Sequence, residues 1–119
     1  MTEHPIHRLD DDVHQRVRLG ILACLAGVTR VDFAFLRDEL GVTDGNLGRH
    51  LEVLDAAGLV SMSKSSGRGR GRTWVKINRS GREALRREIE ALRQILTAIA
   101  PDPVDDQSSD APVGTANST

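Results

Sequence analysis

Two short segments with the apolar spacing of helices meet at Gly41, and this junction restricts the fold more than any other feature of the 119-residue sequence. Asp32 is a suitable N-cap for the first segment, and Thr43 for the second. Gly41 can adopt the left-handed conformation that ends a helix. The second segment carries leucines at the spacing of one buried face: Leu47, Leu51 and Leu54. Two short helices joined by so tight a turn form a helix-turn-helix.

The hydrophobic spacing changes from a helical to a strand period after Gly58. Residues 59–64 and 73–78 read as strands, and the second is rich in β-branched and aromatic residues. The stretch between them, residues 65–71, contains only serine, glycine and arginine and has nothing to bury. Two strands around a glycine-rich loop predict a β-hairpin directly after the helix-turn-helix.

One more helix is expected on each side of this unit. Apolar residues spaced three and four apart predict a first helix over 11–26, with the carboxylates of residues 10–12 as N-caps. Residues 28–31 form either a short connection or a stub strand. Ser80 is the expected N-cap of a long last helix over 80–100, which ends at two prolines.

The chain length allows one domain. We expect a loose N-terminal arm at 1–9, a domain at 10–100 and a disordered acidic tail at 101–119, where Asp, Ser and Pro predominate. The predicted fold class is mainly α with a small β-hairpin (α+β).

The long last helix carries an apolar seam whose members are spaced 4, 3, 4 and 3 residues apart. A soluble monomer rarely exposes such a row, so the spacing predicts that two chains pair through it as a homodimer. The alternative is that the seam packs inside its own chain. The predicted dimerisation residues are Leu85, Ile89, Leu92, Leu96 and Ile99.

A net charge of −1 conceals an uneven distribution. Residues 1–100 hold 16 basic and 13 acidic residues, and residues 101–119 hold four acidic residues and no basic one. Residues 56–82 contain no acidic residue. Their seven cations create a local positive field that favours an anionic partner. These cations are Lys64, Arg68, Arg70, Arg72, Lys76, Arg79 and Arg82.

The helix that begins at Thr43 presents a polar face with suitable chemistry for a DNA major groove. Asn46 can pair with adenine edges and Arg49 with guanine edges, and Thr43 can donate to a phosphate. The alternative is that these are ordinary polar surface residues. The candidate DNA-binding residues are Thr43, Asp44, Gly45, Asn46, Arg49 and His50 on the helix, with Lys64, Arg68, Arg70 and Arg72 on the hairpin.

From residue 13 to 99 the sequence resembles winged-helix transcriptional regulators, the broad group that includes the MarR and ArsR families. Residues 35–51 (FLRDELGVTDGNLGRHL) and 51–60 (LEVLDAAGLV) carry the resemblance. It implies a winged helix-turn-helix whose hairpin is the wing and whose last helix, 80–100, dimerises. It also implies that Thr43, Asn46, Arg49 and His50 occupy DNA-reading positions, and that dimers bind palindromic operators.

The sequence therefore predicts a sequence-specific regulator of transcription that binds double-stranded DNA and acts as a repressor by occupying its site. The alternative is a winged-helix protein–protein interaction module without specific DNA readout. No Ser/His/Asp grouping, paired carboxylate site or phosphate loop argues for an enzyme or a cofactor. A small-molecule effector remains open, because no residue marks a pocket for one.

Metal binding and membrane insertion are not expected. Cys24 lies among apolar residues of the first helix and is expected in the core. His4, His7 and His14 are close in sequence but lack a partner ligand at fixed helical spacing. The absence of an 18-residue apolar run and of a signal peptide predicts a cytoplasmic protein.

Overall fold

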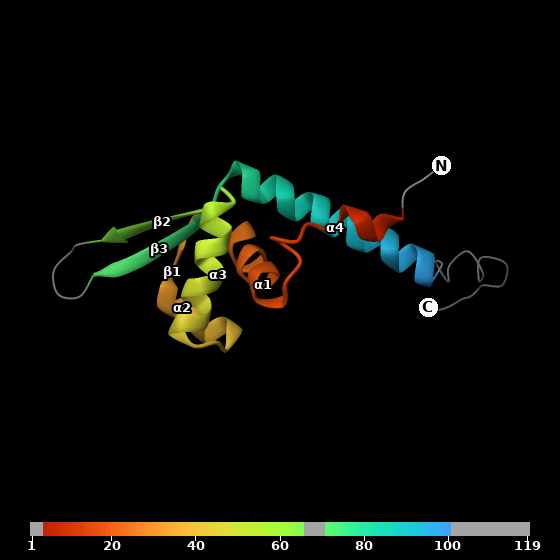
Figure 1. Cartoon of the computed structure of the whole chain (residues 1–119). Helices are drawn as coiled ribbons and strands as arrows, with labels where there is room; N and C mark the ends of the chain where they lie inside the picture. The colour runs from red at the N-terminus through yellow and green to blue at the C-terminus, as the bar shows by residue number, and fades with distance from the viewer. Residues whose placement is uncertain (1–3, 66–70, 101–119) are drawn as a thin grey trace, which may run out of the picture.

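The computed structural model describes residues 4–65 and 71–100. It is mainly helical with one small antiparallel sheet (Figure 1), so the predicted fold class is confirmed. In chain order the elements are the 3-10 helix η1 (Pro5–Arg8), α1 (Arg16–Ala26), β1 (Val31–Asp32), α2 (Phe33–Leu40), α3 (Asp44–Ala56), β2 (Val60–Ser65), β3 (Arg72–Ile77) and α4 (Arg79–Ile99).

The helix-turn-helix forms around the predicted capping residues. The Asp32 carboxylate accepts the Phe35 backbone N–H at 2.8 Å and starts α2. Gly41 ends α2 in the left-handed conformation, with a φ of 65°. Thr43 Oγ1 accepts the Asn46 backbone N–H at 3.1 Å and starts α3. Because the helix ends are satisfied locally, the short connection holds α3 in a defined direction relative to α2.

The first helix begins later than predicted. The range 11–26 is wrong at its start, because α1 begins at Arg16 and the side chain of Gln15 accepts two N–H groups of the first turn. The Asp10 carboxylate instead accepts the Asp12 backbone N–H at 2.8 Å and closes a separate turn. Short acidic side chains stabilise such turns in competition with helix, which explains the difference.

The sheet has the strand order β1-β3-β2 and is antiparallel throughout. The predicted hairpin is confirmed as β2 and β3, with Val60 opposite Ile77. Of the segment 28–31, Val31 forms a strand and pairs with Val75. Side chains alternate across a sheet, and those of Val75 and Ile77 lie in the core. The short β1 therefore ties the hairpin to the start of α2.

The long helix α4 is capped by Asn78, and the prediction of Ser80 is wrong. Asn78 Oδ1 accepts the Gly81 backbone N–H at 3.0 Å. The ladder between β2 and β3 ends at the pair of Val60 and Ile77, so Asn78 is the first residue free to cap a helix. From there α4 runs for 21 residues and extends well past α1–α3 and the sheet (Figure 1).

The N-terminal segment lies against α4. The sequence predicted a loose arm at 1–9, of which residues 1–3 lie outside the described part of the chain. In the structure, Pro5–Arg8 forms one turn of 3-10 helix beside α4 (Figure 1). The Arg8 guanidinium donates to Gln94 Oε1, which ties this turn to the C-terminal half of α4.

The core is aliphatic and is shared by α1, α2, α3, the sheet and the first half of α4. Cys24, expected in the core, is half-buried and packs against the core. Burial, with a further contribution from the charge of Glu39, raises the pKa of the Cys24 thiol, which therefore stays protonated at neutral pH. The largest fully buried aliphatic side chains are Ile21, Leu22, Leu25, Leu36, Leu47, Leu51 and Leu54, with Val13, Val60 and Val75.

Candidate nucleic-acid interface

The leucine stripe of α3 determines which of its residues face solvent. Leu47, Leu51 and Leu54 are at most 1% exposed, so the helical period turns the opposite side outward. The structure brings the six candidate residues of this segment together around the N-terminal turns of α3. Thr43, Asp44, Gly45 and Arg49 are exposed, and Asn46 and His50 are half-buried.

Thr43 caps α3 and still has a hydrogen to donate. Its Oγ1 acts as acceptor for the Asn46 N–H, and the hydroxyl hydrogen stays available for a second partner. The first backbone N–H groups of α3 also lack intrahelical acceptors and lie at the positive end of the helix dipole. The start of α3 therefore has the chemistry to accept a phosphate.

Asp44, a candidate contact residue, is neutralised from across the turn. Arg37 donates from Nη1 to the Asp44 carboxylate at 3.0 Å and from Nε to Asp38 at 3.0 Å. Hydrogen bonds to Asp38 first, and then to Asp44, raise the pKa of the Arg37 guanidinium. Because the Asp44 charge is paired, it repels an incoming phosphate less than a free carboxylate would.

His50 lies toward α1 and hydrogen-bonds to it. Arg18 Nη1 is 3.1 Å from His50 Nδ1. An arginine can only donate, so Nδ1 is the acceptor and Nε2 carries the hydrogen of the neutral ring. Burial in the first place, and then the charges of Arg18 and Arg49, lower the pKa of His50. His50 therefore offers one N–H donor and no charge at neutral pH.

The replacement His50→Gln is expected to make the fold less sensitive to acid. The folded-state pKa of His50 lies below the unfolded value of about 6.5, so the unfolded chain binds more protons as the pH falls through this window. This contribution to stability is present above the unfolded pKa and is lost on acidification. Glutamine can still accept from Arg18 but does not titrate.

Urea unfolding at about pH 7.5 and about pH 5.5 measures this effect, since the two values bracket the usual histidine pKa. The free energy of unfolding should fall less between them in His50→Gln than in the wild type. The exposed His7 provides the control, because His7→Gln removes a histidine without a contact to α3. An equal loss in His50→Gln and wild type would contradict the assignment.

The hairpin contributes two described candidate residues. Lys64 is exposed near the end of β2. Arg72 lies at the start of β3, where its Nη1 is 3.1 Å from the Asp32 carboxylate. Arg68 and Arg70, the other two predicted wing contacts, lie outside the described residues. The described pair therefore lies at the end of the hairpin opposite Val60 and Ile77, and Arg72 pairs there with the N-cap residue of α2.

Trp74 on β3 contacts Arg72 and one further arginine, Arg30. The Arg30 guanidinium carbon lies 3.9 Å from the centroid of the Trp74 ring, and that of Arg72 lies 5.9 Å from it. Such cation–π contacts hold a guanidinium in place without neutralising it. The sequence did not single out Arg30, because its partner is 44 positions away and no local pattern links the two.

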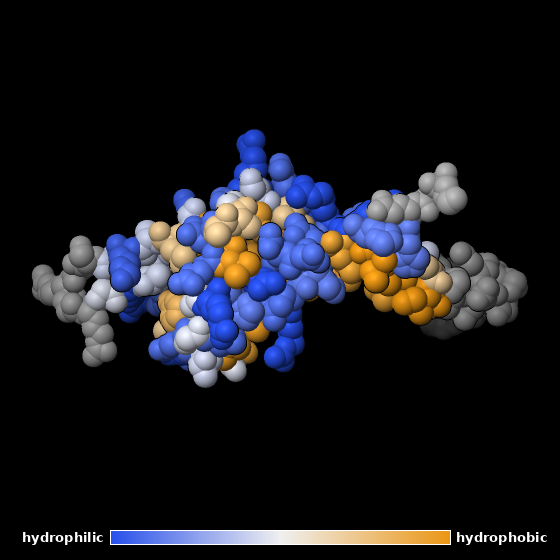
Figure 2. Space-filling view, in the orientation of Figure 1, coloured by the Kyte–Doolittle hydropathy of each residue, from blue (hydrophilic) through white to orange (hydrophobic). Residues whose placement is uncertain are grey.

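The apolar seam of α4, defined by its five predicted residues, is largely uncovered within the single chain. Leu85 is buried against α1 and Leu92 is half-buried. The remaining members, Ile89, Leu96 and Ile99, are 45%, 64% and 73% exposed. Figure 2 shows the corresponding apolar surface along α4, away from the rest of the domain. The described chain therefore buries Leu85 in its own core and leaves three of the five seam residues exposed.

Residues 4–65 and 71–100 contain neither a candidate metal site nor a candidate membrane-spanning helix. No group of three or more His, Cys, Asp or Glu side chains in these ranges is arranged to hold a metal ion. None of the helices described there has the length and apolar character needed to cross a membrane.

Comparison with known proteins gives one consistent result. The family model described as "Winged helix DNA-binding domain" matches residues 17–96. An uncharacterised protein of Methanocaldococcus jannaschii is 40% identical over 79 residues, covering 66% of this chain and 86% of the relative. A transcriptional regulator homologue of Pyrococcus horikoshii superposes with a TM-score of 0.72 at 31% identity, covering 76% of this chain and 90% of the other.

A DNA complex is among the similar structures. Sco3205, a MarR-family transcriptional regulator of Streptomyces coelicolor that was solved with DNA, gives a TM-score of 0.63. At 22% identity, over 89% of this chain and 69% of that one, the likeness concerns the fold.

Proposed function

Because the chain belongs to the winged helix DNA-binding domain family, we propose that it is a transcriptional regulator that reads a palindromic site in double-stranded DNA as a homodimer. The observation that carries this proposal is the outward face of α3, followed by a hairpin rich in cations and free of carboxylates. We propose that residues 10–100 form the unit that binds DNA and dimerises.

In this proposal α3 is the recognition helix. Arg49 and Asn46 read base edges in the major groove, where guanine and adenine present matching acceptors and donors. Thr43 and the first N–H groups of α3 hold a phosphate. His50 contributes its Nε2–H, and Asp44 and Gly45 lie at the point of closest approach. Lys64 and the wing arginines Arg68, Arg70 and Arg72 contact the backbone or the minor groove.

The exposed seam supports the dimer. Full burial of one Leu or Ile side chain contributes about 1.5–3 kcal/mol, and a two-fold axis doubles the number buried. Pairing along α4 would place two copies of α3 at equivalent positions on either side of the axis. A separation of about 34 Å between recognition helices matches one turn of DNA, so the operator is expected to be a palindrome. A dimer bound at a promoter represses by excluding polymerase from the site.

Selection of bound sequences from random duplex DNA tests the proposal. Enrichment of a palindrome would support sequence-specific binding, two-fold symmetry and the half-site spacing in one experiment. Enrichment of a single half-site would support DNA reading and contradict the dimer. Binding to all duplexes alike, or to none, would contradict specific readout and favour a protein–protein interaction module.

The triple replacement of Arg68, Arg70 and Arg72 by glutamine is expected to weaken binding to every duplex. Each phosphate contact that is lost reduces the number of counterions released when the protein binds DNA. The slope of log affinity against log salt should therefore become shallower by about 0.9 per contact. Fluorescence anisotropy with specific and random duplexes between about 50 and 200 mM salt measures this slope.

A matched control removes the same three charges from the exposed side of α4 by replacing Arg86, Arg87 and Arg93 with glutamine. This control should keep a slope close to that of the wild type. If the hairpin variant and the α4 variant change the slope equally, the wing does not contact phosphates.

A further inference from the structure

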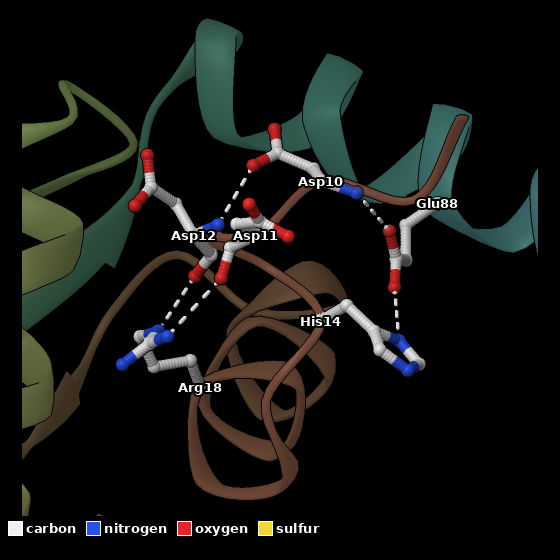
Figure 3. Close-up of polar contacts among 6 residues, drawn as sticks. All are labelled: Asp10, Asp11, Asp12, His14, Arg18 and Glu88. Atoms are coloured by element: carbon white, nitrogen blue, oxygen red, sulfur yellow. Dashed lines mark hydrogen bonds and ion pairs between the residues drawn. The ribbon is translucent and has the colours of Figure 1, made fainter. Parts of the chain in front are cut away.

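Glu88 is the one charged side chain that is fully buried among the described residues, and it lies on the inner face of α4. Its Oε2 is 2.6 Å from His14 Nδ1, and its Oε1 accepts the Asp10 backbone N–H at 3.1 Å (Figure 3). Removing a carboxylate from water costs several kcal/mol unless its oxygens are paired. Both oxygens are paired here, and both partners lie in the turn of residues 10–14.

The same turn is held from its other side by Arg18 of α1. Its Nε donates to the Asp12 carbonyl at 2.6 Å and its Nη2 to the Asp11 carbonyl at 3.1 Å (Figure 3). The third nitrogen of the guanidinium, Nη1, donates to His50 Nδ1 on α3. One planar guanidinium therefore joins the 10–14 turn to the recognition helix.

These contacts form a continuous polar connection from α4 to α3. It runs from Glu88 through the 10–14 turn to Arg18 and His50. The apolar contacts of α1 with α3 and α4 also join these helices, but apolar packing is non-directional and tolerates small rotations. Charge-assisted hydrogen bonds have preferred angles and resist such rotations.

We propose that Glu88 and Arg18 are positioning residues that set the orientation of α3 relative to α4 by holding the 10–14 turn between them. The inference rests on the proposed function, because in a dimer joined through α4 this orientation sets the distance between the two recognition helices. Glu88 and Arg18 then govern which half-site spacing the protein accepts, without touching a base.

Glu88→Gln and Arg18→Lys test the proposal with little change in volume. Glutamine can still accept from Asp10 but loses the carboxylate charge that faces His14. Lysine keeps the charge of Arg18 but cannot bind three acceptors in one plane. The matched controls are Glu90→Gln, whose carboxylate is 55% exposed on α4, and Arg16→Lys at the start of α1.

The probe is the palindrome obtained by selection, together with duplexes whose half-sites are one base pair closer or further apart. One base pair rotates a half-site by about 34°, so a rigid dimer should prefer its own spacing at least about tenfold. The two variants are expected to reduce this preference to about threefold or less, while the controls keep it. Equal weakening at all spacings, or an unchanged preference, would overturn the proposal.

Hydrogen exchange without DNA provides a second readout that does not depend on the proposed function. Amides of the 10–14 turn and of the turn of α3 that carries His50 should exchange faster in Glu88→Gln and Arg18→Lys than in the controls. Wild-type protection in both variants would overturn the inference even if no palindrome were ever selected. If Glu88→Gln fails to fold, Arg18→Lys decides, because Arg18 lies at the half-exposed end of the connection.

Discussion

The replacement Leu96→Glu is expected to convert the proposed dimer into a folded monomer. Leu96 is 64% exposed in the single chain, so its own fold loses little apolar contact. In a dimer joined through α4 the side chain is buried twice, once in each subunit, and each copy contributes about 1.5–3 kcal/mol. The variant also places two carboxylates in an apolar contact. The dimer should therefore dissociate at least about a hundredfold more readily.

Sedimentation velocity at micromolar concentration measures the change. Thr97→Glu is the matched control, because it adds the same charge one position along α4 and outside the seam. The control should remain dimeric, and the Leu96→Glu monomer should unfold in urea as a cooperative unit. Its affinity for a palindrome should fall towards that for a single half-site. A Leu96→Glu protein that dimerises like the wild type would show that the seam is not the interface.

The parts of the fold that were predicted correctly depend on local signals that agree with one another. In α3, the cap at Thr43 and the stripe of Leu47, Leu51 and Leu54 both indicate the same helix. Gly41 had one physical role available at that junction, and the structure gives it a positive φ. When the capping residue, the apolar stripe and the turn residue all indicate the same helix boundaries, tertiary packing does not shift them.

The boundaries that were predicted wrongly lie where two local signals compete. Asp10 can cap a helix or close its own turn, and Asn78 and Ser80 can each cap α4. Tertiary structure decides both cases. The ladder that ends at Ile77 selects Asn78, and Glu88 of α4 binds the Asp10 N–H and holds this residue outside the helix.

The polar connection through Glu88 could not be predicted from the sequence. Its partner His14 lies 74 positions away, and Glu88 stands in a run of charged residues that resembles a solvated helix face. Arg18 likewise looks like one of many surface arginines until the fold brings the 10–14 turn beside it. The ion pair of Arg37 with Asp44 differs in this respect. An arginine and an aspartate on either side of a tight turn can be recognised in the sequence.

Arg49→Ala is expected to lower affinity for the selected palindrome by about 1–3 kcal/mol, which corresponds to roughly 5- to 150-fold. Arg49 is exposed on α3, and its side chain has no hydrogen bond or ion pair with the residues that the structure describes. Truncating it therefore removes little from the fold. In a major groove its five donors can form two parallel hydrogen bonds with guanine, and a wrong base leaves those donors unpaired.

The loss of affinity for other DNA sequences shows whether Arg49 contacts a base or a phosphate. If Arg49 reads a base, Arg49→Ala should relax the preference at one operator position in each half-site and bind random duplex almost as well as the wild type. If it holds a phosphate, affinity should fall equally on both duplexes, and the salt slope should drop by about 0.9 per subunit. Arg49→Lys separates the two further. Lysine keeps the charge but not the two-pronged geometry, so it should preserve random binding and lose part of the discrimination.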